Sequence, residues 1–403
     1  MLNIFQTKYL NERQLSGFDK YKYACIDNSP ISVYISHPFW NWVVEFYPHW
    51  LPPNVLTLSG FIVLISSFVL VSLFDYDFSS NSFGSNKTVP NWIWLLCAVA
   101  TFLAHLLDGT DGKQARKTGA CGPTGELFDH GFDSWSTVPL TLTIFSIFGR
   151  GDYSELLLFD ISPFVMLTVL ISVQLVFICS HWEKYNTGVL FLSWGYDASQ
   201  YKLNFGLCFF YLFAFFASPK TFHFNLFNGL SLAYFICLTF FISCFLSLTS
   251  CLYNIYHAYL ISKTGKQETI GSGLKPLLSP LLLFSFTLMW GAYSPNKVLE
   301  LDPRAFFWTM GVVFSNIAVH LIIAQMSSTK VVAITTLLLV YIFVALMSLI
   351  GLFASFELLV LRTSAVLFTL AHIVYGICVI NQLCDHFKIQ PLSLSYLHQK
   401  QNK

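Results

Sequence analysis

The chain has 403 residues, of which 55% are hydrophobic and only 11% are charged, and its mean hydropathy is +0.61. Soluble domains average about 25% charged residues, so this composition excludes a soluble globular protein and requires most of the surface to face lipid. The formal net charge of +1 gives no electrostatic basis for binding nucleic acid, and we expect no nucleic-acid partner.

The segment before the first apolar run is charged and rich in aromatic side chains. Trp40, Trp42, Tyr47 and Trp50 all lie within residues 18–50. Because aromatic side chains concentrate at membrane–water interfaces, we predict an N-terminal segment that lies on the membrane surface. An ordered cytosolic cap is the alternative.

Apolar runs long enough to cross a bilayer follow along the rest of the chain. A membrane-spanning helix needs about 20 mostly apolar residues. We find ten such runs, near residues 55–75, 91–110, 126–148, 156–179, 203–219, 230–260, 277–293, 305–326, 331–353 and 359–383. We therefore predict an all-α, polytopic integral membrane protein with about ten transmembrane helices.

The positive charges favour one orientation of these helices. An even number of spans places both termini on one side, and most of the 22 Lys and Arg residues then lie on that side. Cytosolic loops carry the excess of Lys and Arg in membrane proteins. We therefore predict that both termini face the cytosol, as does the joint between the second and third apolar runs.

Four carboxylates and one guanidinium lie at that joint, and charges next to the bilayer are costly enough to mark a functional site. They belong to Asp108, Asp111, Arg116, Asp129 and Asp133. The first two aspartates are three residues apart and the last two are four apart, so each pair projects from one face of a helix. Two facing pairs would give four convergent carboxylates, which are the oxygen ligands that Mg²⁺ prefers.

The residues between the two acidic pairs suit a phosphate ester. Gly112 and Ala115 leave room for a flat ligand beside the helix, and the planar fork of Arg116 can pair with a phosphate. Two cations about 4 Å apart can stabilise both the attacking and the leaving oxygen of a displacement at phosphorus. The cluster therefore favours phosphoryl transfer from a diphosphate ester.

This pattern resembles the signature of the CDP-alcohol phosphatidyltransferase family, D-x2-D-G-x2-A-R-x8-G-x3-D-x3-D. All its fixed positions are met, by Asp108, Asp111, Gly112, Ala115, Arg116, Gly125, Asp129 and Asp133. The resemblance implies a site that binds a CDP-linked alcohol and uses Mg²⁺ or Mn²⁺, with two ions held by the four aspartates. It further implies a CDP-binding role for Asn54, Gly112, Ala115, Arg116 and Gly125.

The resemblance extends over nearly the whole chain to the eukaryotic choline/ethanolamine phosphotransferases. Gly125-Glu-Leu-Phe-Asp-His-Gly131 and Ser180-His-Trp-Glu-Lys-Tyr-Asn-Thr-Gly188 carry it. Trp194-Gly-Tyr-Asp197 and Gln325-Met-Ser-Ser-Thr329 look most like the ethanolamine branch that includes selenoprotein I, although the selenocysteine-bearing tail of those members is not in this sequence. The implied reaction transfers phosphoethanolamine from CDP-ethanolamine to diacylglycerol, giving phosphatidylethanolamine and CMP. Use of CDP-choline, alone or as well, is the alternative.

The resemblance also implies an organisation in four parts. These are an N-terminal interfacial segment (1–54), a catalytic core (55–200), C-terminal helices for lipid entry and a dimer contact (201–385), and a cytosolic tail (386–403). A homodimer, surrounded by lipid in the membrane of the endoplasmic reticulum or Golgi, is expected from the family.

Two residues compete to accept the proton of the attacking hydroxyl. Asp133 is the usual suggestion for the wider family, but a carboxylate bound to a metal is a weak base. His130 follows Asp129 directly and titrates near cytosolic pH, so we favour His130. The alternative for His130 is an orienting hydrogen bond to a metal-bound carboxylate. Glu183 is a candidate for contact with the ethanolamine ammonium, or else part of an interfacial polar cluster.

A transporter, in which buried acids mark an ion path, is the remote alternative for the whole chain. The acids gather at one boundary instead of several spans, which argues against it. We expect His320 and His372, which lie in later apolar runs, to be packed and hydrogen-bonded rather than part of the site. We expect the same packing role for most of the 10 cysteines.

Overall fold

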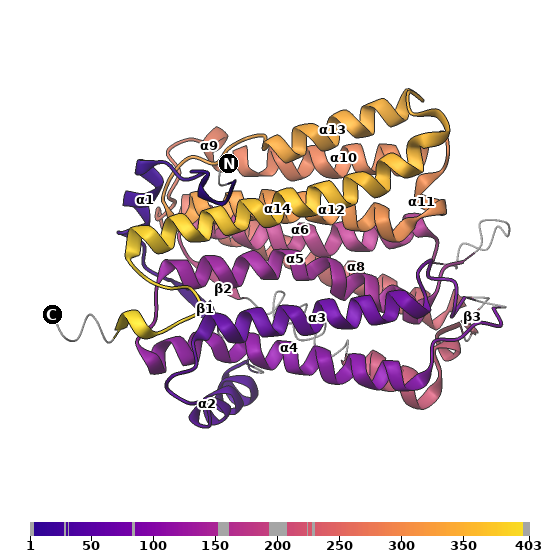
Figure 1. Cartoon of the computed structure of the whole chain (residues 1–403), viewed down its shortest axis with the longest axis horizontal. Helices are drawn as coiled ribbons and strands as arrows, with labels where there is room; N and C mark the ends of the chain where they lie inside the picture. Colours follow the sequence, from indigo (N-terminus) through magenta and orange to yellow (C-terminus); the bar gives the residue numbers. More distant parts are fainter. Residues whose placement is uncertain are drawn as a thin grey trace.

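The computed structural model describes residues 4–27, 30, 32–82, 85–151, 161–192, 208–223, 225–227 and 230–397. Within these ranges the chain forms a bundle of long helices that lie side by side (Figure 1). The strands among the described residues are short: β1 (Cys25–Asp27) pairs in parallel with β2 (Leu190–Leu192), and β3 (Asn225–Phe227) pairs with β4 (Leu230–Ser231). The all-α prediction is therefore confirmed, whereas the Trp194–Asp197 motif lies outside the described residues.

The helices of the bundle follow the predicted apolar runs. They are α3 (Pro53–Phe74), α4 (Asn91–Thr118), α5 (Pro123–Phe148), α6 (Pro163–Thr187), α8 (Leu232–Tyr256), α10 (Leu278–Tyr293), α12 (Pro303–Met326), α13 (Thr336–Leu349) and α14 (Glu357–Phe387), with a further apolar helix at Cys208–Ala217. Shorter helices are α1 (Glu12–Phe18), α2 (His37–Glu45), α9 (Ile270–Leu274) and α11 (Val298–Leu301).

Seven helical segments among the described residues are long and apolar enough to cross a membrane. They contain α3, α4, α6, α8, α9 with α10, α12 and α14. Of the other predicted runs, one forms the acid-bearing α5, and two form the shorter apolar helices α13 and Cys208–Ala217. These helices fit a multi-pass membrane protein, and the count of about ten spans stays a prediction.

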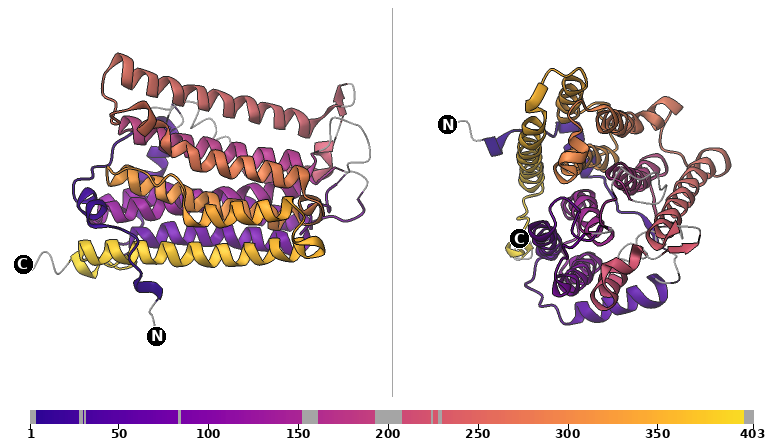
Figure 2. Two further views of the ribbon diagram at one scale, coloured as in Figure 1. Left: turned by 90° about the horizontal axis from the view of Figure 1, so that it is seen from above. Right: turned by 90° about the vertical axis from the view of Figure 1, so that its right-hand side faces the viewer.

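Helix α12 lies in the core of the bundle, and nearly all of its side chains are buried. It packs against α5, α6, α10, α13 and α14. Small residues allow the closest approach, because a Cβ added at Gly311 would lie 2.2 Å from the Cγ2 of Val138 on α5. By contrast α8 lies at the edge of the bundle (Figure 2), and the apolar side chains of Phe245 and Leu246 are exposed, as expected for a lipid-facing surface.

The two described histidines predicted to pack do so. His320 lies 3.3 Å from the hydroxyl of Tyr375, measured from its Nδ1 atom, and the Nε2 atom of His372 lies 3.1 Å from the hydroxyl of Ser315. None of the ten cysteines, all of which lie in the described residues, forms a disulfide. Apart from the exposed Cys121, the cysteines are buried or half-buried and belong with the two histidines to the packing of the bundle, as predicted for most of them.

The N-terminal segment is fixed to the end of the bundle that carries the acidic residues. Strand β1 joins β2 just after α6, and α2 packs along α4. The aromatic side chains of Trp42, Phe46 and Trp50 remain exposed beside α2, which suits the predicted position on a membrane surface. Both described ends of the chain lie at this same end of the bundle, as the predicted even number of spans requires (Figure 1).

Gly17 in α1 sets how closely the N-terminal segment approaches the link after α12. A Cβ added at Gly17 would lie 2.0 Å from the backbone oxygen of Ser327, and backbone cannot give way as a side chain can. We expect Gly17→Ala to destabilise the protein by about 1–3 kcal/mol, measured as a lower thermal unfolding temperature in detergent. Gly271→Ala is the control, because nothing lies within 4 Å of a Cβ built there; equal unfolding temperatures for both variants would contradict this contact.

Candidate active site

A tight turn brings the two acidic pairs face to face. Helix α4 ends at Thr118, and Gly119 follows with a φ of 73°, a left-handed conformation that glycine adopts without strain. Helix α5 begins at Pro123, whose fixed φ suits the first turn of a helix. The two helices consequently run in opposite directions, with one acidic pair on each.

The carboxylates converge as the spacing predicted. Ligand atoms of Asp108, Asp111 and Asp129 all lie within 4.8 Å of one another, and so do those of Asp129, His130 and Asp133. Oxygens on opposite sides of a Mg²⁺ ion are about 4 Å apart, because each lies about 2.1 Å from the metal. Moreover, the Oδ1 atom of Asp129 is buried and lacks a hydrogen-bond partner among the described residues. The donor set therefore fits a divalent cation, as predicted.

Thr57 on α3 supports this cluster, a role that was not predicted from the sequence, where only its place near Asn54 could have indicated it. Its hydroxyl donates a short hydrogen bond to the Oδ2 atom of Asp111, and both side chains are buried. This bond holds one carboxylate oxygen of Asp111, which belongs to the ligand group with Asp108 and Asp129. Thr57 is thus a positioning residue for a metal ligand.

We expect Thr57→Val to weaken divalent-cation binding by about 10- to 100-fold, the usual cost of losing the partner of a ligating side chain. Binding of Mn²⁺ to the purified protein measures this. Thr57→Ser keeps the hydroxyl and should bind Mn²⁺ nearly as well as the unchanged protein. Equal Mn²⁺ affinity for the Val and Ser variants would contradict the role of the hydroxyl.

His130 lies between three carboxylates on α5. Its Nδ1 atom lies 3.6 Å from the Oδ2 of Asp133 and 4.0 Å from the Oδ2 of Asp129, while its Nε2 atom lies 3.7 Å from the Oε1 of Glu126. The ring also meets that of His181 edge-on, with centroids 5.2 Å apart. His130 is thus adjacent to the acid cluster, where both predicted roles are possible.

Glu126 and its partners form a second polar group, which the sequence did not predict. Its Oε1 atom accepts hydrogen bonds from the hydroxyl of Tyr21, at 2.6 Å, and from the Nζ of Lys184, at 2.7 Å. Burial, with the nearby carboxylate as a further cause, raises the pKa of Tyr21 well above its ordinary value. Tyr21 therefore keeps its proton and acts as the donor in this bond.

The predicted CDP-binding residues lie around the turn between α4 and α5. A Cβ at Gly125 would lie 3.4 Å from the Oδ1 atom of Asn54, so these two residues are neighbours. A Cβ at Gly112 would meet only the Nη1 of Arg116, at 3.9 Å, so space for a ligand remains beside α4. Arg116 is exposed and makes no ion pair within the described part of the chain. Ala115 lies half-buried on the same helix.

Glu183 lies apart from these residues. Its Oε1 atom accepts a hydrogen bond of 2.7 Å from the Nδ2 of Asn254 on α8. It lines a small cavity between α6 and α8, together with Cys251 and Ser247. The described contacts thus join Glu183 to α8 and not to the acid cluster, and its contact with a substrate headgroup stays a prediction.

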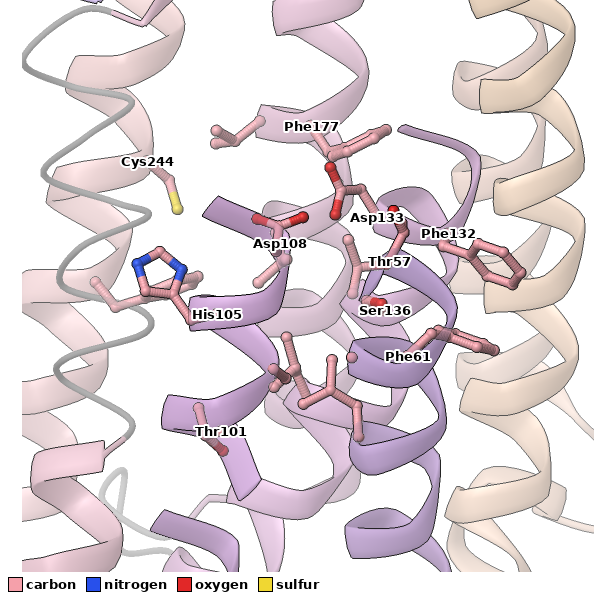
Figure 3. Close-up of a pocket in the computed structure, with 18 residues that line it drawn as sticks. Thr57, Phe61, Thr101, His105, Asp108, Phe132, Asp133, Ser136, Phe177 and Cys244 are labelled. Atoms are coloured by element: carbon pink, nitrogen blue, oxygen red, sulfur yellow. The ribbon is translucent and has the colours of Figure 1, made fainter. Parts of the chain in front are cut away.

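A larger pocket leads from the acids into the apolar interior (Figure 3). The carboxylates of Asp108 and Asp133 point into one end of it, and Thr57, His105 and Ser136 lie nearby. Most other lining residues are apolar and come from α3, α4, α5 and α6, with Phe240 and Cys244 from α8. Such a pocket suits an amphiphile whose polar end meets the carboxylates.

Comparison with known proteins agrees with this site. The model of the CDP-alcohol phosphatidyltransferase family matches residues 50–237. Mouse ethanolaminephosphotransferase 1 is 43% identical over 393 residues, covering 96% of this chain and 95% of its own length. The chain belongs to the CDP-alcohol phosphatidyltransferase family.

Two human relatives show which branch this chain is more similar to. Human ethanolaminephosphotransferase 1 is 42% identical over 392 residues, with 96% of this chain and 95% of the relative covered. Human cholinephosphotransferase 1 is 27% identical over 330 residues, covering 80% of this chain and 74% of its own length. The ethanolamine branch, predicted from motifs, is therefore the more similar of the two.

Proposed function

We propose that this protein transfers phosphoethanolamine from CDP-ethanolamine to diacylglycerol, giving phosphatidylethanolamine and CMP. The observation that carries the proposal is the convergence of Asp108, Asp111 and Asp129 beside an apolar pocket whose polar end is lined by Asp108 and Asp133. A water-soluble diphosphate can reach these carboxylates from the end of the bundle, and a lipid hydroxyl can reach them through the pocket. The greater similarity to ethanolaminephosphotransferases supports ethanolamine over choline.

The proposed chemistry is an in-line displacement at the β-phosphorus. Asp108, Asp111, Asp129 and Asp133 would hold Mg²⁺ or Mn²⁺, and a cation bound there neutralises charge on the diphosphate. Arg116 pairs with a phosphate, and Asn54, Gly112, Ala115 and Gly125 receive the CDP group. This assignment rests on the family signature and on the space beside Gly112.

The hydroxyl of diacylglycerol attacks the β-phosphorus, and the bond from that phosphorus to the CMP oxygen breaks. The proton of the hydroxyl passes to His130, as we favoured from the sequence. Asp133 lines the pocket and lies 3.6 Å from the Nδ1 of His130, which places His130 next to the lining of the pocket. Asp133 as the acceptor itself is the alternative.

Product formation by the purified protein tests the proposal. In detergent with diacylglycerol and Mn²⁺, we expect phosphatidylethanolamine from CDP-ethanolamine to exceed phosphatidylcholine from CDP-choline. Equal use of both donors would replace the ethanolamine assignment with a dual one, which is the alternative. No product with either donor would overturn the proposal and favour a different CDP-alcohol or acceptor first, and the transporter alternative only after that.

The remaining parts of the proposal concern the number of metal ions, the oligomeric state, and the location and orientation of the protein in the membrane. We infer two cations at the site, a homodimer, and a location in the endoplasmic reticulum or Golgi membrane with the site and both termini in the cytosol. The family resemblance supports the first three, and the distribution of Lys and Arg supports the orientation. Cysteine labelling from either side of sealed microsomes, at the exposed Cys121 between α4 and α5, tests the orientation directly.

A further inference from the structure

We propose that His105 and Ser136 donate hydrogen bonds to the ester carbonyls of the lipid acceptor, and that this pair selects ester-linked over ether-linked glycerolipids. The inference rests on the proposed function and deepens it, because it names residues that recognise the acceptor in the same pocket. Both side chains line that pocket, and neither is a fixed position of the family signature.

The polar side chains at this end of the pocket lie in two layers. Asp108 and Asp133 form the first layer. His105 lies three residues before Asp108 on α4, and Ser136 lies three residues after Asp133 on α5. Since the two helices run in opposite directions, both steps lead away from the acids into the bundle, by about 4.5 Å for three residues of α-helix. His105 and Ser136 therefore form a second polar layer, one helical turn deeper (Figure 3).

The order of these layers matches the order of groups along a diacylglycerol. Beyond the second layer most of the lining is apolar, with Leu64 on α3 and Leu140 on α5. In the lipid, five bonds of about 1.2–1.5 Å separate the free hydroxyl oxygen from the nearest ester carbonyl oxygen, so the two lie about 5 Å apart. An acceptor whose hydroxyl meets the carboxylates therefore has a carbonyl at the second layer and its acyl chains in the apolar part.

The hydroxyl of Ser136 is available for such a bond. It makes no hydrogen bond within the described part of the chain, whereas the hydroxyls of Ser134 and Thr137 beside it both donate to backbone carbonyls of α5. A hydroxyl that faces an apolar pocket without a partner is costly. An ester carbonyl of the acceptor would satisfy it.

The ring of His105 is held in position by the N-terminal segment. Trp40 on α2 meets it edge-on, with ring centroids 5.6 Å apart. Trp40 itself packs tightly on α4, because a Cβ added at Gly109 would lie 2.3 Å from its Cε2 atom. A neutral imidazole carries one N–H donor, and a ring whose orientation is already fixed loses little entropy when it binds. His105 is therefore placed to donate to a carbonyl in the pocket.

Acceptor selectivity tests the pair. With CDP-ethanolamine as the donor, dioleoylglycerol is compared with the matching dioleyl glycerol ether, which has the same chains and no carbonyl. A site built to hydrogen-bond a group discriminates against an analogue that lacks it. We expect kcat/KM for dioleoylglycerol to exceed that for the ether by about 10- to 100-fold, as the loss of two hydrogen bonds predicts. Equal use of the two acceptors would overturn the inference.

The double variant His105→Phe with Ser136→Ala separates recognition from stability. Phe keeps an aromatic ring against Trp40, and Ala removes a hydroxyl that has no partner in the described residues. We expect kcat/KM for dioleoylglycerol to fall about 10- to 100-fold and that for the ether to stay within about twofold. Equal losses with both acceptors would indicate a structural role only and overturn the inference.

Ser136→Ala alone carries the test if the double variant has a lower thermal unfolding temperature. We expect it to lower kcat/KM about 5- to 10-fold for dioleoylglycerol and not for the ether. Ser66→Ala is the matched control, because Ser66 is exposed on α3, does not line the pocket and donates to the carbonyl of Ile62. Its acceptor preference should equal that of the unchanged protein, and equal preferences for the two serine variants would overturn the role of Ser136.

The unchanged protein separates this inference from the proposed function. If it forms no phosphatidylethanolamine from dioleoylglycerol, the proposed function has failed and this inference falls with it. If it forms the product but uses the ether equally well, the recognition of the ester carbonyls alone has failed.

Discussion

Asp129→Asn is expected to abolish phosphatidylethanolamine formation. The loss of activity should be well above the roughly 100-fold that follows when only the hydrogen-bond partner of a metal ligand is removed. Asp129 belongs to both groups of convergent ligands, and its Oδ1 atom is buried without a partner among the described residues. The amide keeps the size of the side chain but removes one negative charge and one oxygen. Mn²⁺ binding and product formation, measured on the same preparation, should both be lost.

Asp385→Asn provides the control for this prediction. Asp385 is an exposed carboxylate near the end of α14, at the same end of the bundle. Its loss should leave product formation within about twofold, as for most surface substitutions. Normal turnover by the Asp129 variant would remove Asp129 from the metal-binding set and undermine the proposed site.

His130→Ala is the second change with a large expected effect. Removing a general base typically costs about 10²- to 10⁴-fold in rate. Because the signature aspartates and Arg116 remain, CDP-ethanolamine should still bind, and its affinity can be measured by calorimetry. His130→Ala should therefore lower kcat and leave substrate binding nearly unchanged.

The exposed His49 supplies the control, since His49→Ala removes an imidazole that lies in the N-terminal segment. Near-normal turnover by His130→Ala would assign the proton to Asp133 instead. A loss of CDP-ethanolamine binding together with turnover would indicate that His130 supports the ligand carboxylates, which is the alternative role that we retained.

Local patterns in the sequence predicted the helices and the acid cluster, because both depend on short-range spacing. Residues three or four apart on a helix share a face whatever surrounds them. The turn between α4 and α5 also follows from local signals, namely Gly119 after the first helix and Pro123 at the start of the second. For these features the structure adds distances to an arrangement that was already expected.

The partners from distant segments were not predictable in the same way. The bond from Thr57 to Asp111 and the bond from Tyr21 to Glu126 join residues 54 and 105 positions apart. No periodicity links such residues, since only the packing of the helices brings them together. For Glu183 the local motif indicated a site residue that the packing does not bring to the site. Its side chain accepts a hydrogen bond from Asn254 on α8 and does not contact the signature aspartates.

The buried position of α12 has a consequence for biosynthesis. A ribosome completes α3 to α6, with all the signature residues, long before it reaches Pro303. Until then α5 lacks the helix that contacts Val138 through Gly311, and the hydroxyl of Ser134 lacks its partner on Ser315. Before α12 is made, α5 and α6 must therefore remain in the membrane with the faces that later pack against α12 uncovered. A nascent chain halted before α12 should be held by membrane chaperones or degraded, and it should lack activity despite an intact signature.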